Sequence, residues 1–133
     1  MSDIEKSNDF VLNEHVDEET KTNKKKLRCI RCNSLILQEM TSVFKKCEQS
    51  IPMPSMKPKK DLANPSNIET IDSNMFWLVD DMMKFDNVGF TNLVDKKKYL
   101  ICADCEIGPI GLQPNADVTN EFLVCVDRVK YVL

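Results

Sequence analysis

The sequence predicts a mainly β domain with little helix, and three observations support this fold class. Apolar residues occur in short runs that polar turns separate, as expected for short strands. No window of about 12 residues shows apolar residues at a clean 3.6-residue period, so the helix content should be low. Two Cys-x-x-Cys pairs stand near the start and the end of the part that looks folded, and small β domains often need such a covalent or metal link.

Several stretches are apolar, β-branched or alternating enough to form strands. In chain order these are residues 34–38, 41–45, 76–79, 98–101 and 122–133. In the last stretch, Phe122, Val124 and Val126 fall on one face, and the alternation resumes at Val129. Because side chains alternate between the two faces of a strand, these stretches predict short antiparallel sheets with one apolar face each.

Two segments have the composition of loops. Residues 1–26 hold seven acids and five lysines with few, scattered apolar residues, which predicts a disordered charged tail. Residues 47–74 hold four of the six prolines and a lysine cluster, which predicts a long loop. Residues 27–133 are therefore predicted to form a single domain that contains this loop.

The pairs Cys29–Cys32 and Cys102–Cys105 indicate a metal site. A thiolate is a soft anionic ligand, and the two-residue spacer lets both sulfurs of a tight turn face one ion. Two such turns supply the four tetrahedral sulfurs that Zn²⁺ prefers. The 69 residues between the pairs exceed the roughly 15–20 of a compact zinc ribbon. One structural Zn²⁺ would therefore join the start and the end of the domain.

Redox chemistry and disulfide bonding are the alternatives for these cysteines. A thioredoxin-like dithiol accompanies a β-α-β pattern, which surrounds neither pair. The chain begins with acidic residues and no apolar run, so we expect no secretory signal and no oxidising compartment. Outside the pairs, Cys47 should be a surface thiol and Cys125 a buried one, while His15, in the predicted tail, is a poor ligand candidate.

Charge and apolar length argue against several classes of function. Residues 27–133 hold 14 acids and 13 bases, which is not the basic footprint of a nucleic-acid binder. The longest apolar stretches, such as 122–126, fall far short of the ~20 residues that span a bilayer. A single histidine in a tail gives a serine or cysteine hydrolase no positioned base. We expect no nucleic-acid partner, no membrane insertion and no covalent chemistry.

The segment 77–91 mixes large apolar side chains with acids, a composition typical of a protein-binding face. Its aromatic residues could equally belong to the core, because a small domain usually buries a lone tryptophan. Asp104 is different, because it lies inside a cysteine pair whose sulfurs point inward and whose intervening side chains usually face outward.

The string Cys102-Ala-Asp-Cys-Glu-Ile-Gly-Pro-Ile-Gly111 strongly resembles a motif of the Rab-interacting factor family. Members of this family are small zinc proteins that act on exocytic Rab GTPases as guanine-nucleotide exchange factors or nucleotide-free chaperones. Three further pieces match in order: Cys29-Ile-Arg-Cys32, Pro54-Ser-Met56, and the long segment from Trp77 to Thr91 that contains Phe85-Asp-Asn-Val-Gly-Phe90. The resemblance spans about residues 27–129.

The resemblance implies a zinc-stapled "tent" of short antiparallel sheets. The implied zinc ligands are Cys29, Cys32, Cys102 and Cys105. The implied GTPase-binding residues are Asp104, Glu106, Trp77, Asp81, Met82, Phe85 and Asn87, with Asp104 the strongest candidate. Two departures stand out: Asn33 follows the first pair where glycine is common, although asparagine also tolerates positive φ, and Leu112-Gln113 replaces a bulkier aromatic found in some members.

The resemblance also implies a function. The protein would bind the switch region of a Rab-type GTPase, prefer its nucleotide-free form and promote GDP release in vesicle transport and exocytosis. We expect a monomer in the cytoplasm that reaches secretory vesicle membranes through its Rab partner. A zinc-ribbon nucleic-acid module, or a Cys-x-x-Cys thiol oxidoreductase, remains the alternative. Salt-sensitive binding to generic DNA or RNA would indicate the first, and dithiol activity with little bound zinc the second.

Overall fold

The computed structural model describes residues 12–53, 69–91, 96–116 and 120–132. Its elements in chain order are α1 (Leu12–His15), β2 (Lys26–Cys29), β3 (Leu35–Leu37), β4 (Val43–Pro52), β5 (Thr70–Val79), the 3₁₀ helix η2 (Met82–Lys84), β6 (Val88–Phe90), β7 (Lys98–Cys102), β8 (Gly111–Gln113), β9 (Phe122–Cys125) and β10 (Val129–Val132). Among the described residues, no helix has the length and apolar content that crossing a bilayer requires.

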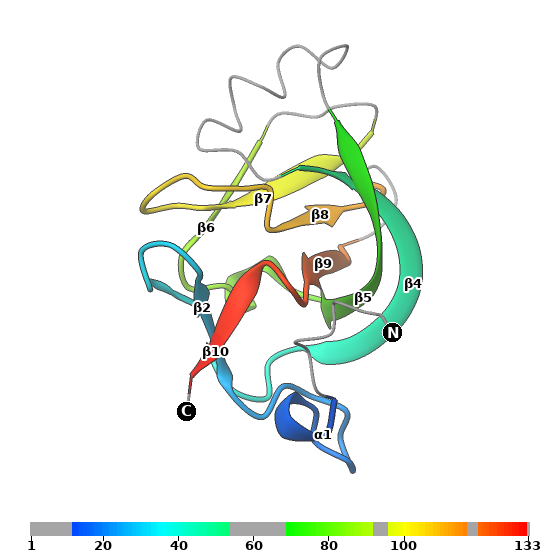
Figure 1. Ribbon diagram of the computed structural model, residues 1–133, viewed down its shortest axis with the longest axis vertical. Helices are drawn as coiled ribbons and strands as arrows, with labels where there is room; N and C mark the ends of the chain where they lie inside the picture. Colours follow the sequence, from blue (N-terminus) through cyan, green and yellow to red (C-terminus); the bar gives the residue numbers. More distant parts are fainter. Residues whose placement is uncertain (1–11, 54–68, 92–95, 117–119, 133) are drawn as a thin grey trace.

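The strands form two antiparallel sheets, which confirms the prediction of a mainly β fold. A three-stranded sheet has the order β10-β2-β3, and a six-stranded sheet has the order β4-β5-β9-β8-β7-β6. The long strands β4 and β5 curve together along one side of the molecule, with β2 and β10 on the other (Figure 1). The two cysteine pairs begin at the last residues of β2 and β7, one in each sheet.

The main core combines residues from both sheets. Leu27 and Ile36 of the small sheet join Trp77, Leu100 and Val124 of the large sheet in one buried cluster. As predicted, Phe122, Val124 and Val126 all belong to it. Burying a large apolar side chain contributes roughly 1.5–3 kcal/mol, so this cluster is the main source of stability apart from any metal.

A second cluster forms on the opposite face of the large sheet. Phe76 of β5 and both Leu123 and Cys125 of β9 contribute to it, while their neighbours Trp77 and Val124 point to the main core. Strand β9 is therefore buried on both faces, which explains why its sequence is continuously apolar rather than alternating.

Gly111 allows β8 to approach β9 closely. A Cβ atom at this position would lie 2.1 Å from the carbonyl oxygen of Leu123 and 2.9 Å from Cα of Val124. Both are backbone atoms that cannot rotate away. The close approach of these strands therefore requires glycine here.

The loop predicted at 47–74 is shorter than expected. Strand β4 continues through Cys47 to Pro52, and β5 begins at Thr70, so strand pairing extends into the predicted loop at both ends. The central residues 54–68, including the Pro-Ser-Met triplet, lie outside the described residues. Pro52 is tolerated because β4 is an edge strand and Pro52 is its last residue.

The predicted disordered tail is also wrong for residues 12–26, while residues 1–11 lie outside the described residues. Bridges join Val16 to Asn23 and Thr22 to Val43, and His15 is buried with its ring stacked on Tyr131, the ring centroids 4.1 Å apart. Composition suggested disorder because it averages over the charges of a segment. The composition of a segment cannot show that a few of its residues are buried and attach it to the domain.

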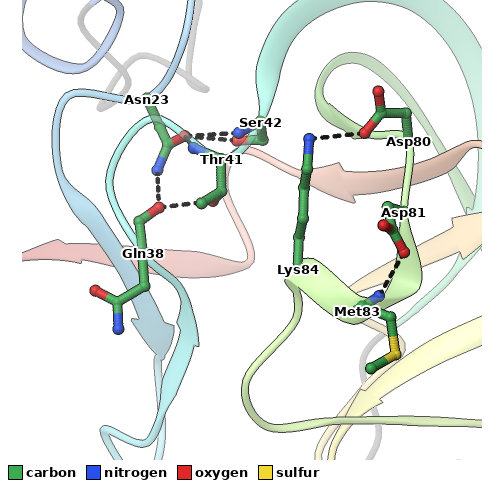
Figure 2. A network of polar contacts seen from close by, with 8 residues as sticks. All are labelled: Asn23, Gln38, Thr41, Ser42, Asp80, Asp81, Met83 and Lys84. Carbon is green, nitrogen blue, oxygen red and sulfur yellow. Dashed lines mark hydrogen bonds and ion pairs between the residues drawn. The ribbon is translucent and has the colours of Figure 1, made fainter.

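Asn23 is the centre of this attachment. Its side-chain amide donates hydrogen bonds to the carbonyls of Lys25 and Gln38, both 2.8 Å, as Figure 2 shows for Gln38. Its carbonyl oxygen accepts from the Thr41 and Ser42 amides, at 3.1 and 3.0 Å, and from the Ser42 hydroxyl at 2.8 Å (Figure 2). The side chain is fully buried, and both of its N–H donors have partners. A single amide thus connects the N-terminal segment, β3 and the start of β4.

Candidate metal centre and partner-binding face

The two cysteine turns have the same backbone geometry. In the first, the amide of Asn33 donates to the carbonyl of Cys29 at 3.0 Å, and the amide of Cys29 donates to the carbonyl of Ser34 at 2.8 Å. In the second, the equivalent bonds run from Glu106 to Cys102 at 2.8 Å and from Cys102 to Ile107 at 3.1 Å.

Each turn requires a residue with positive φ at its fifth position. These residues are Asn33 at φ 68° and Glu106 at φ 63°. Asparagine adopts this conformation readily, so it can replace the expected glycine.

The four sulfurs converge on one point. The Sγ atoms of Cys29, Cys32, Cys102 and Cys105 all lie within 4.8 Å of one another. The Cys29–Cys105 and Cys32–Cys102 separations are 3.5 and 3.6 Å, far beyond the about 2.05 Å of a disulfide. A tetrahedron with Zn–S bonds of about 2.3 Å has sulfurs about 3.8 Å apart, so the residues fit a metal ion. Four sulfur donors of this kind could hold one.

Hydrogen bonds surround the sulfurs. The amides of Arg31 and Cys32 donate to Sγ of Cys29 at 3.4 and 3.5 Å, and Nδ2 of Asn87 donates to Sγ of Cys102 at 3.3 Å. The hydroxyl oxygen of Ser34 lies 3.2 Å from Sγ of Cys32. Such outer contacts orient thiolates and offset the negative charge of a four-thiolate site.

The pKa is shifted in opposite directions for Cys32 and for the two cysteines of the second turn. Hydrogen bonding to Ser34 lowers the pKa of Cys32 to about 6, whereas burial raises the pKa of Cys102 and raises that of Cys105 to about 12. Cys32 therefore ionises more readily than Cys102 and Cys105. Because metals bind thiolates, metal binding to this site would release the protons of Cys102 and Cys105.

The remaining cysteines do not join this site. Cys125 is buried as predicted, and burial raises its pKa to about 11. Cys47 is half-buried against the second core cluster rather than a surface thiol, and burial raises its pKa as well.

The second cysteine turn presents two acids to solvent. Asp104 and Glu106 are both exposed, and the Asp104 carboxylate accepts a hydrogen bond from the Ser34 hydroxyl of the first turn. Ser34 was not among the residues selected from the sequence. Nothing in its sequence neighbourhood indicates that its hydroxyl meets a carboxylate 70 positions away.

The segment 80–87 provides a second exposed group. Asp81 and Met82 are exposed, Asp81 caps η2 by accepting from the Met83 amide at 2.9 Å, and Met83 is 82% exposed (Figure 2). Sequence analysis did not single out Met83, although it lies within the segment that was selected. A surface hollow of about 550 Å³ adjoins η2, lined by Asp80, Asp81, Met82, Lys84, Asn120 and Phe122.

Trp77 does not lie on this surface. Its side chain is fully buried, with its indole Nε1 donating to the Tyr131 hydroxyl at 3.0 Å, and it belongs to the main core cluster against which Phe85 packs. Phe85 is half-buried, with its ring 5.8 Å from that of Phe122. Asn87 is also half-buried and turned toward the metal centre. The outward placement predicted for Trp77 is therefore wrong in this structure.

Backbone hydrogen bonds connect the segment to both cysteine turns. Asp86 donates to the Ile36 carbonyl at 2.9 Å, and Phe85 bridges to Leu37 just after the first turn. The Ala103 amide donates to the Asn87 carbonyl at 3.3 Å, which joins the segment to the second turn. The candidate partner-binding residues thus lie on a segment that backbone hydrogen bonds connect to both cysteine turns.

The fold and the site define a class of protein: a small antiparallel β domain whose two sheets meet at a four-thiol centre. The chain belongs to the Mss4 family, whose family model, described as Mss4 protein, matches residues 22–131. This confirms the family resemblance found in the sequence.

Two relatives illustrate the similarity. One is a Drosophila melanogaster protein named "Guanine nucleotide exchange factor MSS4 homolog", 43% identical over 89 residues, which cover 67% of this chain and 70% of the relative. The other is a Schizosaccharomyces pombe protein of the same name, 30% identical over 103 residues, which cover 77% of this chain and 92% of the relative.

Proposed function

We propose that this protein is a guanine-nucleotide exchange factor, or a chaperone of the nucleotide-free form, for a Rab-type small GTPase in vesicle transport and exocytosis. The observation that carries the proposal is a four-thiol centre with exposed acids on one turn and an exposed acid–methionine segment attached beside it. Two relatives named as guanine nucleotide exchange factors support it.

In this proposal Cys29, Cys32, Cys102 and Cys105 hold one structural Zn²⁺. The all-sulfur donor set and the sulfur separations near 3.5 Å suit Zn²⁺ better than a hard cation, which prefers oxygen. When bound, the ion supplies folding free energy rather than reaction chemistry. The domain would have no covalent catalytic step of its own.

The GTPase-binding face would consist of exposed acids and methionine over a half-buried layer. Asp81, Asp104 and Glu106 provide carboxylates for basic groups, and Met82 provides an adaptable apolar contact for switch-region side chains. Phe85 and Asn87 form the layer beneath. Trp77 then acts only by supporting this layer from the core.

Nucleotide release follows from a difference of affinities. A small GTPase holds its nucleotide through Mg²⁺, a phosphate-binding lysine and ordered switch loops. A factor that binds loaded and empty forms equally shifts nothing, so this face must bind the empty form more tightly. Engaging the switch residues with the acids and Met82 would draw them away from Mg²⁺ and weaken the hold on GDP.

The test is the release rate of a fluorescent guanine nucleotide from Rab GTPases. The wild-type protein should accelerate release, and Asp104→Ala should slow the accelerated rate by about tenfold, as expected when one partner of an interfacial charge pair is lost. Asp72→Ala is the matched control. Asp72 is also exposed and bonded to a serine hydroxyl, Ser50, but it lies on the β4–β5 ribbon. Equal rates for wild type and Asp104→Ala would remove Asp104 from the mechanism.

The location and assembly proposed for the protein follow from its partner. We place it in the cytoplasm, as a monomer, at secretory vesicle membranes only when its Rab partner is there. In cell fractionation, the wild-type protein should be found partly with membranes, and the Asp104→Ala variant should be found in the soluble fraction. Membrane association that survives this substitution, or a dimer in sedimentation analysis, would contradict this part.

A further inference from the structure

Ser34 stands between the two cysteine turns. Its hydroxyl oxygen lies 3.2 Å from Sγ of Cys32 in the first turn, and it donates a hydrogen bond to Oδ2 of Asp104 in the second. Through this one hydroxyl, a candidate metal ligand is joined to the exposed carboxylate that the proposed function assigns to the GTPase.

The backbone holds Ser34 in this position. The Ser34 carbonyl accepts from the Cys29 amide at 2.8 Å, which closes the first turn. The preceding residue, Asn33, has a φ of 68°, and its carbonyl accepts from Nη1 of Arg28 at 2.9 Å. These bonds hold the main chain of Ser34 between the two turns, where its hydroxyl reaches both neighbours.

The hydroxyl has a single hydrogen for two acceptors. A serine O–H donates one hydrogen bond, and a carboxylate only accepts. A metal-bound cysteine is a thiolate without S–H, so its sulfur also only accepts. With the site loaded, Cys32 Sγ and Asp104 Oδ2 therefore compete for the same Ser34 hydrogen. The geometry of the fold gives that hydrogen to Asp104.

We propose that Ser34 is a positioning residue that orients the Asp104 carboxylate for its partner, and that its hydrogen passes to the Cys32 sulfur when a basic group of the partner engages Asp104. The second half rests on the proposed function, since the GTPase supplies the basic group. The first half concerns this chain alone.

Two consequences follow. A carboxylate already held in place loses less side-chain freedom on binding, so Ser34 should increase affinity without touching the partner. A hydrogen bond to a thiolate reduces the charge it donates to the metal, so occupation of Asp104 should be detectable at the metal itself. A purely structural serine would produce neither the second effect nor its dependence on Asp104.

The first experiment uses the full chain loaded with Co²⁺, whose sulfur-to-cobalt absorption band reports thiolate donation. Asp104→Ala should shift this band to higher energy, because the Ser34 hydrogen then turns to the sulfur. The same substitution in a Ser34→Ala background should produce no shift. Ser50→Ala and Asp72→Ala, the matched serine–aspartate pair on the β4–β5 ribbon with a 2.6 Å contact, should leave the band unchanged. An Asp104→Ala shift that is equal in both backgrounds, or absent from both, overturns the inference.

The second experiment measures affinity for a nucleotide-free Rab. Ser34→Ala should weaken binding about 3- to 10-fold, and Ser34→Thr, which keeps the hydroxyl, should restore it. In an Asp104→Ala background, Ser34→Ala should have no further effect. Loss of affinity from Ser34→Ala that persists without Asp104 would overturn the positioning role. Unchanged metal content in each variant establishes that the site is still formed.

The two experiments separate the two hypotheses. If the cobalt band behaves as expected but Asp104→Ala leaves nucleotide release unaltered, the sharing of the Ser34 hydrogen stands and the assignment of Asp104 to the GTPase fails. If Asp104→Ala slows nucleotide release but its effect on the cobalt band is the same with and without Ser34, the proposed function stands and the inference about Ser34 is overturned.

Discussion

Two corners of this molecule hold distant segments together by different means. At the metal centre, four sulfurs from the ends of β2 and β7 join the two sheets. At the other corner, the amide of Asn23 joins the N-terminal segment to Gln38, Thr41 and Ser42 through hydrogen bonds alone (Figure 2). In the proposed function the first corner depends on a bound ion and on ionised thiols, while the hydrogen bonds of the second corner need neither. The two corners should therefore respond to different chemical conditions, although each connects segments that are distant in the sequence.

Metal removal should have the largest effect. A structural zinc site contributes on the order of 10 kcal/mol, which matches or exceeds the whole stability of a small domain. We expect exhaustive chelation to unfold the protein, with loss of the β signal in circular dichroism and recovery when Zn²⁺ is added. The purified protein should contain one zinc per chain. A domain that stays folded after chelation would show that hydrogen bonds and core packing stabilise the fold without a metal ion.

The substitution Asn23→Ala should cause the second-largest loss of folding stability. It removes the side chain that satisfies the carbonyls of Lys25 and Gln38 and three donors of Thr41 and Ser42. Leaving buried backbone groups unpaired should cost about 2–4 kcal/mol in denaturant unfolding. Zinc content should remain at one per chain, because the metal centre is separate. The control is Gln38→Ala, which removes an exposed side chain and leaves the bonded carbonyl in place.

The N-terminal corner should also loosen in mild acid. Burial, and then the charge of Lys25, lower the pKa of His15, with Lys24 acting in the same direction and Glu14 opposing. A histidine whose pKa is lower folded than unfolded binds fewer protons in the native state, so stability falls as the pH drops below about 6.5. Nuclear magnetic resonance of the Tyr131 ring, stacked on His15, should follow this change.

His15→Gln separates this corner from the metal centre in acid. The metal centre also weakens in acid because thiolates take up protons. The variant should remove the response of Tyr131 below about pH 6.5 but leave the pH at which zinc is released unchanged. A Tyr131 response that survives in the variant would mean that the metal centre controls both corners.

Lys84→Ala should have the smallest effect. Lys84 and Asp80 form an i,i+4 ion pair at 2.8 Å on the exposed side of η2 (Figure 2). Hydrogen bonding to Lys84 lowers the pKa of Asp80, yet both side chains are solvated, and such pairs contribute little to stability. We expect no measurable change in the melting temperature or the zinc content. A clear loss of stability would contradict this expectation and show that the ion pair at η2 contributes to holding the fold together.

Local patterns in the sequence predicted much of the metal centre and several strands. The cysteine spacing is a local property of each turn, and so is the apolar run that forms β9. The surroundings of the sulfurs were not predictable in this way. Contacts such as Asn87 with Cys102, or Ser34 with Asp104, join residues that only chain folding brings together.

The sequence-based predictions that the structure contradicts also failed because they depend on contacts between distant parts of the chain. The family resemblance implied a place for Trp77 on the partner-binding face, but alternation along β5 turns its side chain into the core. The strands β4 and β5 extend into a segment rich in proline because pairing with each other stabilises both, and Pro52 falls on an edge. Residues 12–26 are ordered because a buried asparagine and histidine outweigh a charged composition.

By itself, the sequence determined a β-rich chain with two Cys-x-x-Cys turns and a family resemblance, because residue type, spacing and alternation act over a few positions. Only the tertiary structure decided which side chains face solvent, which of them support the others from within, and that Ser34 meets Asp104 across the two turns. The physical reason is that burial and long-range hydrogen bonds depend on how the sheets pack, and no local stretch of sequence contains that information.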